Sequence, residues 1–330
     1  MAGSLQVRYG EIRSMNLTSR TTMEARARFL KSVRDFFSSE NFLEIDTPCL
    51  KKVPGMEPHL DPFSVRSPSG QESGYLITSP EYSLKQALSA GLEKVYEISH
   101  TFRSGEKGSR FHTAEFLMLE FYRTRIDLNG LMDLTENFLR AVDLNRILGS
   151  GEKKIPRRSV RELLKTIAGC DWDRSSLEEK IVASSLTRLP LEELEYEDCF
   201  YLVFLNFVEP SLPSEFQFLY DYPPEMAALA RIEDGCAKRF ETYFGSLELG
   251  NGFFELSDPT EQRLRFSSER KLREKLGKEA FPIDEEFLGA LDQGLPACSG
   301  NAIGLDRLFL TLQGEETLAR VSPYWARLDR

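Results

Sequence analysis

The stretch VYEISHTFRSGEKGSRFHTAEFLMLEFYR, from Val95 to Arg123, contains two segments of alternating apolar and polar residues on either side of a charged run. Alternation with a period of two predicts two strands of a hairpin, because successive side chains of a strand point to opposite faces of a sheet. In the second strand Phe116, Met118, Glu120 and Tyr122 share one face. A carboxylate and a phenol therefore lie side by side on one wall of the predicted sheet.

Residues 104–114 join these strands and are too many for a tight hairpin turn. The loop carries Glu106, Arg110 and His112. Long charged loops on rigid strands are common places for ligand contacts. The same charges are equally consistent with a solvated loop, since charge in loops is ordinary.

A second stretch, SGNAIGLDRLFLTL from Ser299 to Leu312, begins with spaced glycines and continues as an amphipathic helix with Arg307 in its first turn. A cation at that end opposes the helix dipole, at a cost of a few tenths of a kcal/mol unless an anion compensates. Glycines let a ligand approach the backbone, and the guanidinium fork suits phosphate. The stretch predicts a site for a phosphorylated ligand.

Both stretches resemble signatures of a known family, the class II aminoacyl-tRNA synthetases. FRSGEKGSRFHTAEFLMLEFYR is similar to the second signature of that class, GNAIGLDRLFL to the third and NFLEIDTPCL to the first. TSPEYSLKQAL and ELGNGFFELSDPTEQRLRF resemble segments of its lysyl branch. The similarity runs from about Glu24 to Val321, and five ordered motifs are far more specific than one. It implies an α+β fold, the class II catalytic domain, with an antiparallel β-sheet flanked by helices.

Within the lysyl branch the chain is most similar to the stand-alone paralogues that attach lysine or β-lysine to elongation factor P. No anticodon-binding β-barrel precedes the helix near Met23, and about twenty residues cannot form one. Ala302 also favours the stand-alone paralogues, because glycine is typical at that position in the synthetases. The resemblance thus implies lysine or β-lysine, elongation factor P, ATP and Mg²⁺ as ligands and partners, and argues against tRNA.

Composition is that of an ordinary globular protein, with 330 residues, 41% of them hydrophobic, and a net charge of −10. The negative charge argues against a broad nonspecific surface for nucleic acid. The five cysteines show no CxxC pairing and the three histidines do not cluster, which fits reduced thiols and gives no zinc site. Without a signal peptide or an apolar run of membrane-spanning length, we expect a cytoplasmic protein.

We interpret residues 1–20 as a tail and 21–330 as the catalytic domain, with a mainly helical insertion at about 150–198. Apolar residues at steps of three and four predict a helix from Met23 to Ser39, followed by a short strand from Glu44 to Pro48. By resemblance this helix and strand form a homodimer interface. A plain core helix fits the periodicity equally well.

A strand at Tyr75–Thr78 is expected to lead into a helix capped by Ser79, with Pro80 in its first position. From the sequence alone Glu81 complements the dipole of that helix. By resemblance, Ser79, Pro80 and Glu81 belong to the amino-acid site.

Further along, the pattern predicts a helix over Leu128–Val142, a buried helix or strand over Phe200–Val208 and a strand over Phe216–Tyr222. Three more helices are expected near the end of the chain, at Thr260–Lys275 with Asp258 as its cap, at Asp284–Leu291 and at Glu315–Val321. No P-loop motif occurs, so a nucleotide must be held by other means.

Segments Lys238–Phe244 and Leu247–Leu256 predict a second hairpin with a two-residue turn, which places Tyr243 opposite Glu248 and Glu241 diagonal to it. Two carboxylates at such a distance repel each other unless a cation or a shared proton intervenes. With strict alternation Asn251 and Glu255 lie on the face opposite Glu248. A bulge at Gly250 or Gly252 would place them on the same face as Glu248. The alternative is a pair of solvated glutamates on a weak strand.

Activation of a carboxylic acid by ATP needs charge balance on the triphosphate, in-line placement and stabilisation of the pentacoordinate phosphorus. By resemblance Arg103 contacts the α-phosphate and the substrate carboxylate, Arg307 the γ-phosphate side, and Phe116 with Arg307 encloses the adenine. Glu241 and Glu248 hold magnesium. The implied ATP site consists of Arg103, Glu106, His112, Thr113, Phe116, Glu248, Leu249, Gly304 and Arg307.

A buried ε-ammonium needs anionic and hydroxyl acceptors. By resemblance Glu120, Tyr122 and Glu255 supply them, with Asn251 beside them and Ala302 near the other end of the substrate. The structural alternative for Ala302 is packing beneath the helix that follows.

Two details differ from the family pattern. Ser104 and Gly105 stand between Arg103 and the acid Glu106, which makes the loop one residue longer, and Thr113 replaces an asparagine. Our main hypothesis is an ATP-dependent ligase that makes an aminoacyl-adenylate and transfers the acyl group to a lysine of elongation factor P. The alternatives are a truncated lysyl-tRNA synthetase-like ligase and a catalytically inactive regulatory paralogue.

Overall fold

The computed structural model describes residues 19–106, 109–144 and 154–322, and the predicted tail lies almost wholly outside them. The helices are α1 (Arg20–Ser39), α2 (Glu81–Ser89), α3 (Leu128–Leu139), α5 (Val160–Leu163), α6 (Arg174–Ser184), α7 (Tyr196–Val203), α8 (Pro259–Lys275), α9 (Glu285–Asp292) and α10 (Leu305–Gln313). The strands are β1 (Leu43–Glu44), β2 (Leu50–Lys51), β3 (Ser64–Arg66), β4 (Glu72–Leu76), β5 (Lys94–Phe102), β6 (Glu115–Thr124), β7 (Arg157–Ser159), β8 (Phe216–Tyr222), β9 (Ile232–Glu233), β10 (Cys236–Phe244), β11 (Leu247–Phe254) and β12 (Cys298–Gly304).

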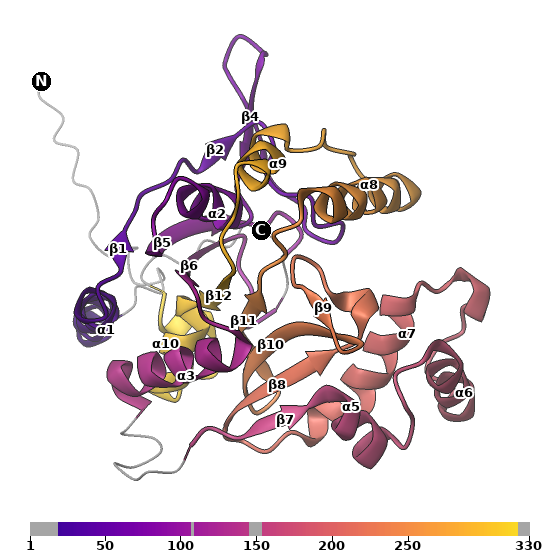
Figure 1. The fold of residues 1–330 in the computed structure, drawn as a ribbon. Coiled ribbons are helices and arrows are strands. Elements are labelled where there is room, and N and C mark those ends of the chain that lie inside the picture. The colour runs from indigo at the N-terminus through magenta and orange to yellow at the C-terminus, as the bar shows by residue number, and fades with distance from the viewer. Residues whose placement is uncertain (1–18, 107–108, 145–153, 323–330) are drawn as a thin grey trace, which may run out of the picture.

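The large sheet runs in the order β1-β5-β6-β12-β11-β10-β8-β7, with β9 beside β10 (Figure 1). Only the outer pairs β1 with β5 and β7 with β8 are parallel among the described strands of this sheet. Both predicted hairpins are confirmed as β5–β6 and β10–β11, the second with its two-residue turn. The predicted mixed fold, an antiparallel sheet flanked by helices, is confirmed.

Helices α1, α3 and α10 cover one face of the sheet, where they pack on Phe121, Phe218 and Phe240. The other face is covered in two places. Helices α2, α8 and α9 lie over the β5–β6 end with Tyr122, whereas α5–α7 lie over the β8–β10 end with Leu219. No helix of the described ranges lies directly above the middle of this second face.

Three local predictions are corrected by the structure. Helix α2 begins at Glu81 with Pro80 in the cap position, one residue later than predicted, although the Ser79 hydroxyl does accept from the Glu81 amide while it donates to Glu120. The strand predicted over 44–48 is confined to Leu43–Glu44, and the last predicted helix is reduced to a 3-10 turn at Leu318–Arg320. The spaced glycines before Arg307 form strand β12 in the middle of the sheet.

The segment Phe200–Val208, for which helix and strand were both open, is helical throughout, as the end of α7 followed by a short π-helix at Phe204–Val208. Within the predicted insertion at 150–198, the described residues contribute β7 to the large sheet and form several short helices. Across the described residues, no helix has both the length and the apolar character needed to span a membrane.

Gly300 lies in β12 directly against the Tyr122 ring, and a Cβ atom built there meets two ring carbons at 2.1 Å. We expect Gly300→Ala to lower the free energy of unfolding by about 1–3 kcal/mol, since overpacking forces the ring or the strand to move. Gly289→Ala is the matched control, because a Cβ atom at that helical position meets nothing within 4 Å. Denaturant titration of both variants tests this, and equal stability in the two would contradict the close contact.

Candidate active site

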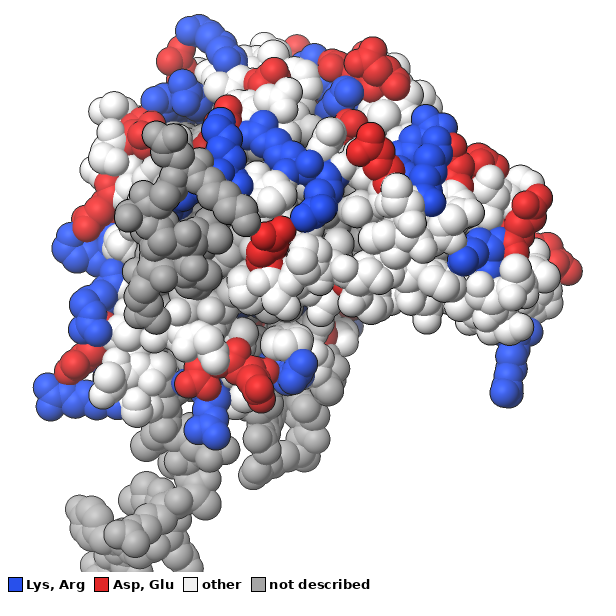
Figure 2. All heavy atoms as spheres, turned by 90° about the horizontal axis from the view of Figure 1, so that it is seen from below, with Lys and Arg blue, Asp and Glu red and all other residues white. Residues whose placement is uncertain are grey.

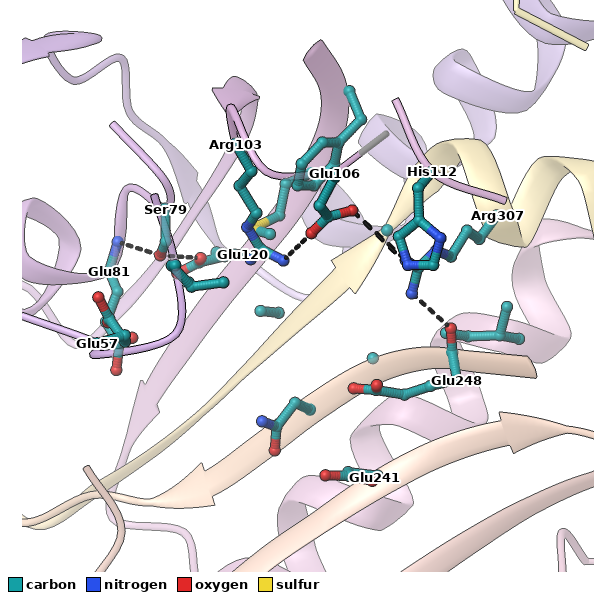
Figure 3. Close-up of a pocket in the computed structure, with 18 of the residues that line it drawn as sticks. Glu57, Ser79, Glu81, Arg103, Glu106, His112, Glu120, Glu241, Glu248 and Arg307 are labelled. Atoms are coloured by element: carbon teal, nitrogen blue, oxygen red, sulfur yellow. Dashed lines mark hydrogen bonds and ion pairs between the residues drawn. The ribbon is translucent and has the colours of Figure 1, made fainter. Parts of the chain in front are cut away.

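A cavity of about 340 Å³ opens on the part of the sheet that the two helical groups leave bare. Its floor is formed by side chains of β6, β12, β11 and β10, and Tyr82 of α2, Glu269 of α8 and Tyr201 of α7 stand at its sides. The loop after β5 closes one end with Phe111 and His112. Thus the sheet and both helical groups contribute to one cavity (Figure 3).

Most of the residues singled out from the sequence line this cavity. They are Ser79, Glu81, Arg103, Glu106, His112, Thr113, Phe116, Glu120, Glu241, Glu248, Leu249, Asn251, Ala302, Gly304 and Arg307. Pro80, Tyr122 and Glu255 are not among the lining residues. The sequence reasoning missed the lining residues Glu57, Tyr201, Arg239 and Glu269. Glu57 lies in a Pro- and Gly-rich segment whose sequence pattern gives no sign of its direction. Arg239 could have been found, because simple alternation along the strand places it on the same face as Glu241.

A β-bulge puts the acids and amides of β11 on the cavity face. The pairing with β10 shifts between Thr242 and Tyr243, so that Thr242 pairs with Gly250 and Tyr243 with Glu248. Leu249 is therefore the extra residue, one position before the glycines expected to hold the bulge. As a result Glu248 and Asn251 both line the cavity, and the buried Asn251 Oδ1 has no hydrogen-bond partner among the described residues.

At one end of the cavity, two arginines converge on Glu106. Arg103 Nη1 donates to Glu106 Oε1 at 3.0 Å, and Arg307 Nη2 lies 3.8 Å from Glu106 Oε2 (Figure 3). The Arg103 guanidinium also stacks on the Phe116 ring, 5.0 Å from its centroid. Burial lowers the pKa of His112, and the charge of Arg307 lowers it further. The extra loop residues thus still bring an acid between the two guanidinium groups.

Arg307 is further oriented by the backbone. Its Nε donates to the Phe111 carbonyl at 3.1 Å and its Nη1 to the Glu248 carbonyl at 3.2 Å. The next residue back, Asp306, accepts from the Leu117 amide at 2.7 Å and pairs with Arg26 of α1 at 2.6 Å. The first turn of α10 is therefore fixed to β6, to β11 and to α1.

The second hairpin brings two carboxylates to the cavity. Glu241 accepts from Tyr222 at 2.5 Å, from Arg239 at 2.5 Å and from Tyr243 at 3.2 Å. The Glu248 carboxylate makes no hydrogen bond with another described residue, and burial, together with the charge of Glu241, raises its pKa to about 7. A cation beside Glu248 would offset this repulsion. The described residues hold no cluster of three or more His, Cys, Asp or Glu side chains fit for a metal, so the protein offers a metal at most two carboxylates here.

At the opposite end lies a chain of hydrogen bonds through Glu120. Ser79 Oγ donates to Glu120 Oε1 at 2.5 Å and accepts from the Glu81 amide at 3.0 Å (Figure 3), while Tyr122 Oη donates to Glu120 Oε2 at 3.0 Å. Burial and the nearby Glu81 raise the pKa of Glu120 to about 8, against the effect of these donors. Tyr122 therefore acts behind Glu120 and orients it, although its ring lies outside the lining.

Beneath this end a lysine is buried with two acids. Lys85 Nζ lies 2.7 Å from Glu81 Oε1 and 2.5 Å from Glu255 Oε2, and Lys85 and Glu255 are at most 1% exposed. Burial alone would lower the pKa of Lys85, but the two carboxylates outweigh it and raise the pKa above its ordinary value. Glu255 is therefore paired with Lys85 beneath the cavity, and of the two acids bonded to this lysine only Glu81 lines it.

A scan against family models matches residues 3–326 to the class II tRNA synthetases for aspartate, lysine and asparagine, described as "tRNA synthetases class II (D, K and N)". The chain belongs to this family. Among curated proteins, it is 35% identical over 324 residues to a protein of Vibrio cholerae, covering 94% of this chain and 97% of that one. A protein of Hamiltonella defensa is 36% identical over 307 residues, covering 91% and 93% of the two chains, and one of Salmonella dublin is 36% identical over 305 residues, covering 90% and 92%. All three are described as "Elongation factor P--(R)-beta-lysine ligase".

Glu120 makes stability depend on pH. Its pKa of about 8 lies above the ordinary value near 4.3, so between these values the folded chain holds a proton that the unfolded chain has lost. The free energy of unfolding should therefore fall as pH rises from about 5 to about 8, by about 1.4 kcal/mol per pH unit for this group. Residue 120 cannot titrate in Glu120→Gln. The free energy of unfolding of this variant minus that of wild type should therefore rise by about 1.4 kcal/mol per pH unit over the same range. Denaturant titrations across this range test the difference, and parallel curves would contradict it.

Proposed function

We propose that this protein is an ATP-dependent ligase that activates lysine or β-lysine as an aminoacyl-adenylate and transfers the acyl group to a lysine side chain of elongation factor P. The relatives with that description are similar to it over nine tenths or more of both chains. The observation that carries the proposal is the polarity of the cavity, which has two guanidinium groups at one end and a carboxylate with hydroxyl neighbours at the other. An amino acid with a second, distal amine fits this order.

In the first step a carboxylate oxygen of the amino acid attacks the α-phosphorus of ATP and pyrophosphate leaves. Of the two arginines at this end, Arg103 is assigned to the carboxylate and the α-phosphate, and Arg307, which is oriented by two backbone carbonyls, is assigned to the outer phosphates. We assign the place between them, taken here by Glu106, to phosphate, because an arginine fork binds either anion. Asn251, whose amide oxygen has no partner among the described residues, is assigned to the substrate.

Glu248 and Glu241 are assigned to Mg²⁺, which takes one or two carboxylates together with phosphate oxygens and water. The raised pKa of Glu248 is consistent with a site built for a cation. When bound, the ion would supply positive charge to the departing pyrophosphate. The remaining ATP contacts are assigned to His112, Thr113, Phe116, Leu249 and Gly304, all of which line the cavity.

In the second step the amine of the acceptor lysine attacks the adenylate carbonyl, loses a proton, and AMP leaves. Figure 2 shows acidic and basic side chains interspersed on the face seen from below, without a broad basic area among the residues drawn in colour. The net charge of −10 supports a protein acceptor over the phosphate backbone of tRNA. Transfer of labelled lysine and β-lysine to elongation factor P or to tRNA separates the two, and transfer to tRNA alone would refute the proposal.

We further propose that residues from 21 onward form one catalytic domain, with 150–198 as an insertion whose helices pack on β8 and β10. The exposed apolar side chains Leu43 and Leu50, which follow α1, are consistent with the proposed homodimer surface. Sedimentation of the protein in solution tests this assembly.

Arg307→Ala should lower pyrophosphate exchange at least 100-fold, because it removes a preorganised cation from the phosphate end of the site. The exposed Arg320→Ala is the matched control and should exchange like wild type. Thermal unfolding of both variants shows whether the loss is local. Normal exchange by Arg307→Ala, or a loss explained by unfolding, would remove the phosphate role.

Ala302→Gly should raise the use of α-lysine relative to β-lysine. Ala302 pairs with Glu120 on one side and with Asn251 on the other, so its methyl group lies between two residues assigned to the substrate. One methyl group in a pocket contributes about 1–3 kcal/mol, which predicts a shift of about fivefold or more without an absolute switch. The ratio of kcat/KM for the two isomers in both proteins decides this. An unchanged ratio favours packing as the role of the methyl group.

A further inference from the structure

The segment 57–61, between β2 and β3, forms part of the cavity wall without belonging to a helix or a strand. Its residues Glu57 and Leu60 line the cavity. Backbone carbonyl groups in such a segment need hydrogen-bond donors from elsewhere. Arg273 of α8, which is 2% exposed, donates to the carbonyl oxygen of Glu57 at 3.0 Å and to that of Leu60 at 2.8 Å. A buried arginine of α8 therefore holds this part of the wall in place.

Asp61 ends this segment and is bound to the same end of α8. Its Oδ1 lies 3.4 Å from Arg273 Nη2, and its Oδ2 accepts from Lys278 Nζ at 3.1 Å. Lys278 follows the last residue of α8 by three positions. Two cations from this region thus fix residue 61.

The backbone carbonyl of Asp61 connects this anchor to the ATP end of the cavity. It accepts from the Ser104 amide at 2.7 Å and from the Ser104 hydroxyl at 3.0 Å. Ser104 directly follows Arg103, and the Glu106 amide donates to the Arg103 carbonyl at 3.4 Å to close a turn. The turn that brings Glu106 to the Arg103 guanidinium is therefore attached to α8 through Asp61.

We propose that Asp61 and Ser104 are positioning residues for the activation step, because they connect the end of α8 to the turn that holds Arg103. The inference rests on the proposed function, which assigns a phosphate to Arg103. A displacement of about 1 Å at a catalytic group can cost about 100-fold in rate, so a fixed turn matters even though neither residue touches the phosphate. The connection also accounts for the longer loop, since Ser104 is one of the residues inserted between Arg103 and Glu106.

Two variants remove parts of the connection near the loop. Asp61→Asn keeps the shape of the side chain and removes the charge, whereas Ser104→Ala removes one of the two hydrogen bonds to the Asp61 carbonyl. Each should lower kcat/KM for ATP in pyrophosphate exchange about three- to tenfold, the equivalent of about one hydrogen bond. The double variant should lose less than the product of the two, because both changes affect one connection.

Ser104→Thr keeps the hydroxyl group and should exchange pyrophosphate like wild type. Fully multiplicative losses in the double variant, or a loss in Ser104→Thr as large as in Ser104→Ala, would overturn the inference. Thermal unfolding of all four variants shows whether a loss follows from stability alone, which would also overturn it.

Lys278→Met tests the distal part of the connection. Lys278 does not line the cavity, and its loss removes one cation from Asp61. This variant should lower kcat/KM for ATP about two- to fivefold, as expected for a partly exposed ion pair. Lys275→Met is the matched control, because the same change three residues earlier removes a lysine that pairs with Glu195 instead. Equal losses in the two variants, or no loss in Lys278→Met, would contradict the proposal.

Amide hydrogen exchange without ligands separates this inference from the proposed function. Asp61→Asn and Lys278→Met should each raise deuterium uptake at the Ser104 amide at least about threefold, since they loosen its acceptor, and Lys275→Met should not. Unchanged uptake would overturn the connection whatever the activity. If uptake changes as expected but wild type exchanges no pyrophosphate, the connection is confirmed, while the proposed function and the role of Asp61 in activation both fail.

Discussion

The buried ammonium of Lys85 is the interaction on which the acidic end of the cavity depends. Helix α2 and the segment after β11 each contribute a carboxylate to it, so Glu81 and Glu255 are held in place by one cation. An isolated buried carboxylate is expensive, and a buried ion pair contributes little net stability unless its geometry is good. The role of this ion pair is to position α2, because it fixes which side of the helix faces the substrate.

The same pair explains why the cavity keeps a surplus of negative charge. One lysine cannot neutralise Glu57, Glu81, Glu120 and Glu255 together, and burial raises the pKa of three of these acids above the ordinary range. The protein without ligand is thus destabilised locally as pH approaches neutrality. A ligand with two ammonium groups removes that penalty. Substrate binding should therefore stabilise the acidic end of the cavity.

The fold was largely predictable because its strands and helices are amphipathic and flanked by clear turn signals. Strand β8, both hairpins and the Asp258 cap of α8 follow from periodicity and from local hydrogen-bonding residues. The start of α2 was predicted one residue early, at Pro80, and the sequence did not reveal that the Ser79 hydroxyl also donates to Glu120, which is 41 residues away in sequence. The bulge at Leu249 was placed at a neighbouring glycine, since the shift of register is set by β10 and by packing on both faces of the sheet.

Cavity-lining residues were predicted mainly where they belong to segments that resemble the family's motifs, and residues outside those motifs were missed. Arg103, Glu120, Glu248 and Arg307 come from the elements that define the cavity floor and its end. Glu57 has no periodic neighbour that reveals its direction, and it is brought beside Glu81 by the β2–β3 segment, whose Met56 amide donates to the Tyr82 hydroxyl of α2. Lys85 shows the same limit, because its i, i+4 partner Glu81 is visible in the sequence but Glu255, 170 residues further on, is not. Long-range pairs of charges thus decide which acids face the ligand, and they are the part of this site that needs the folded chain.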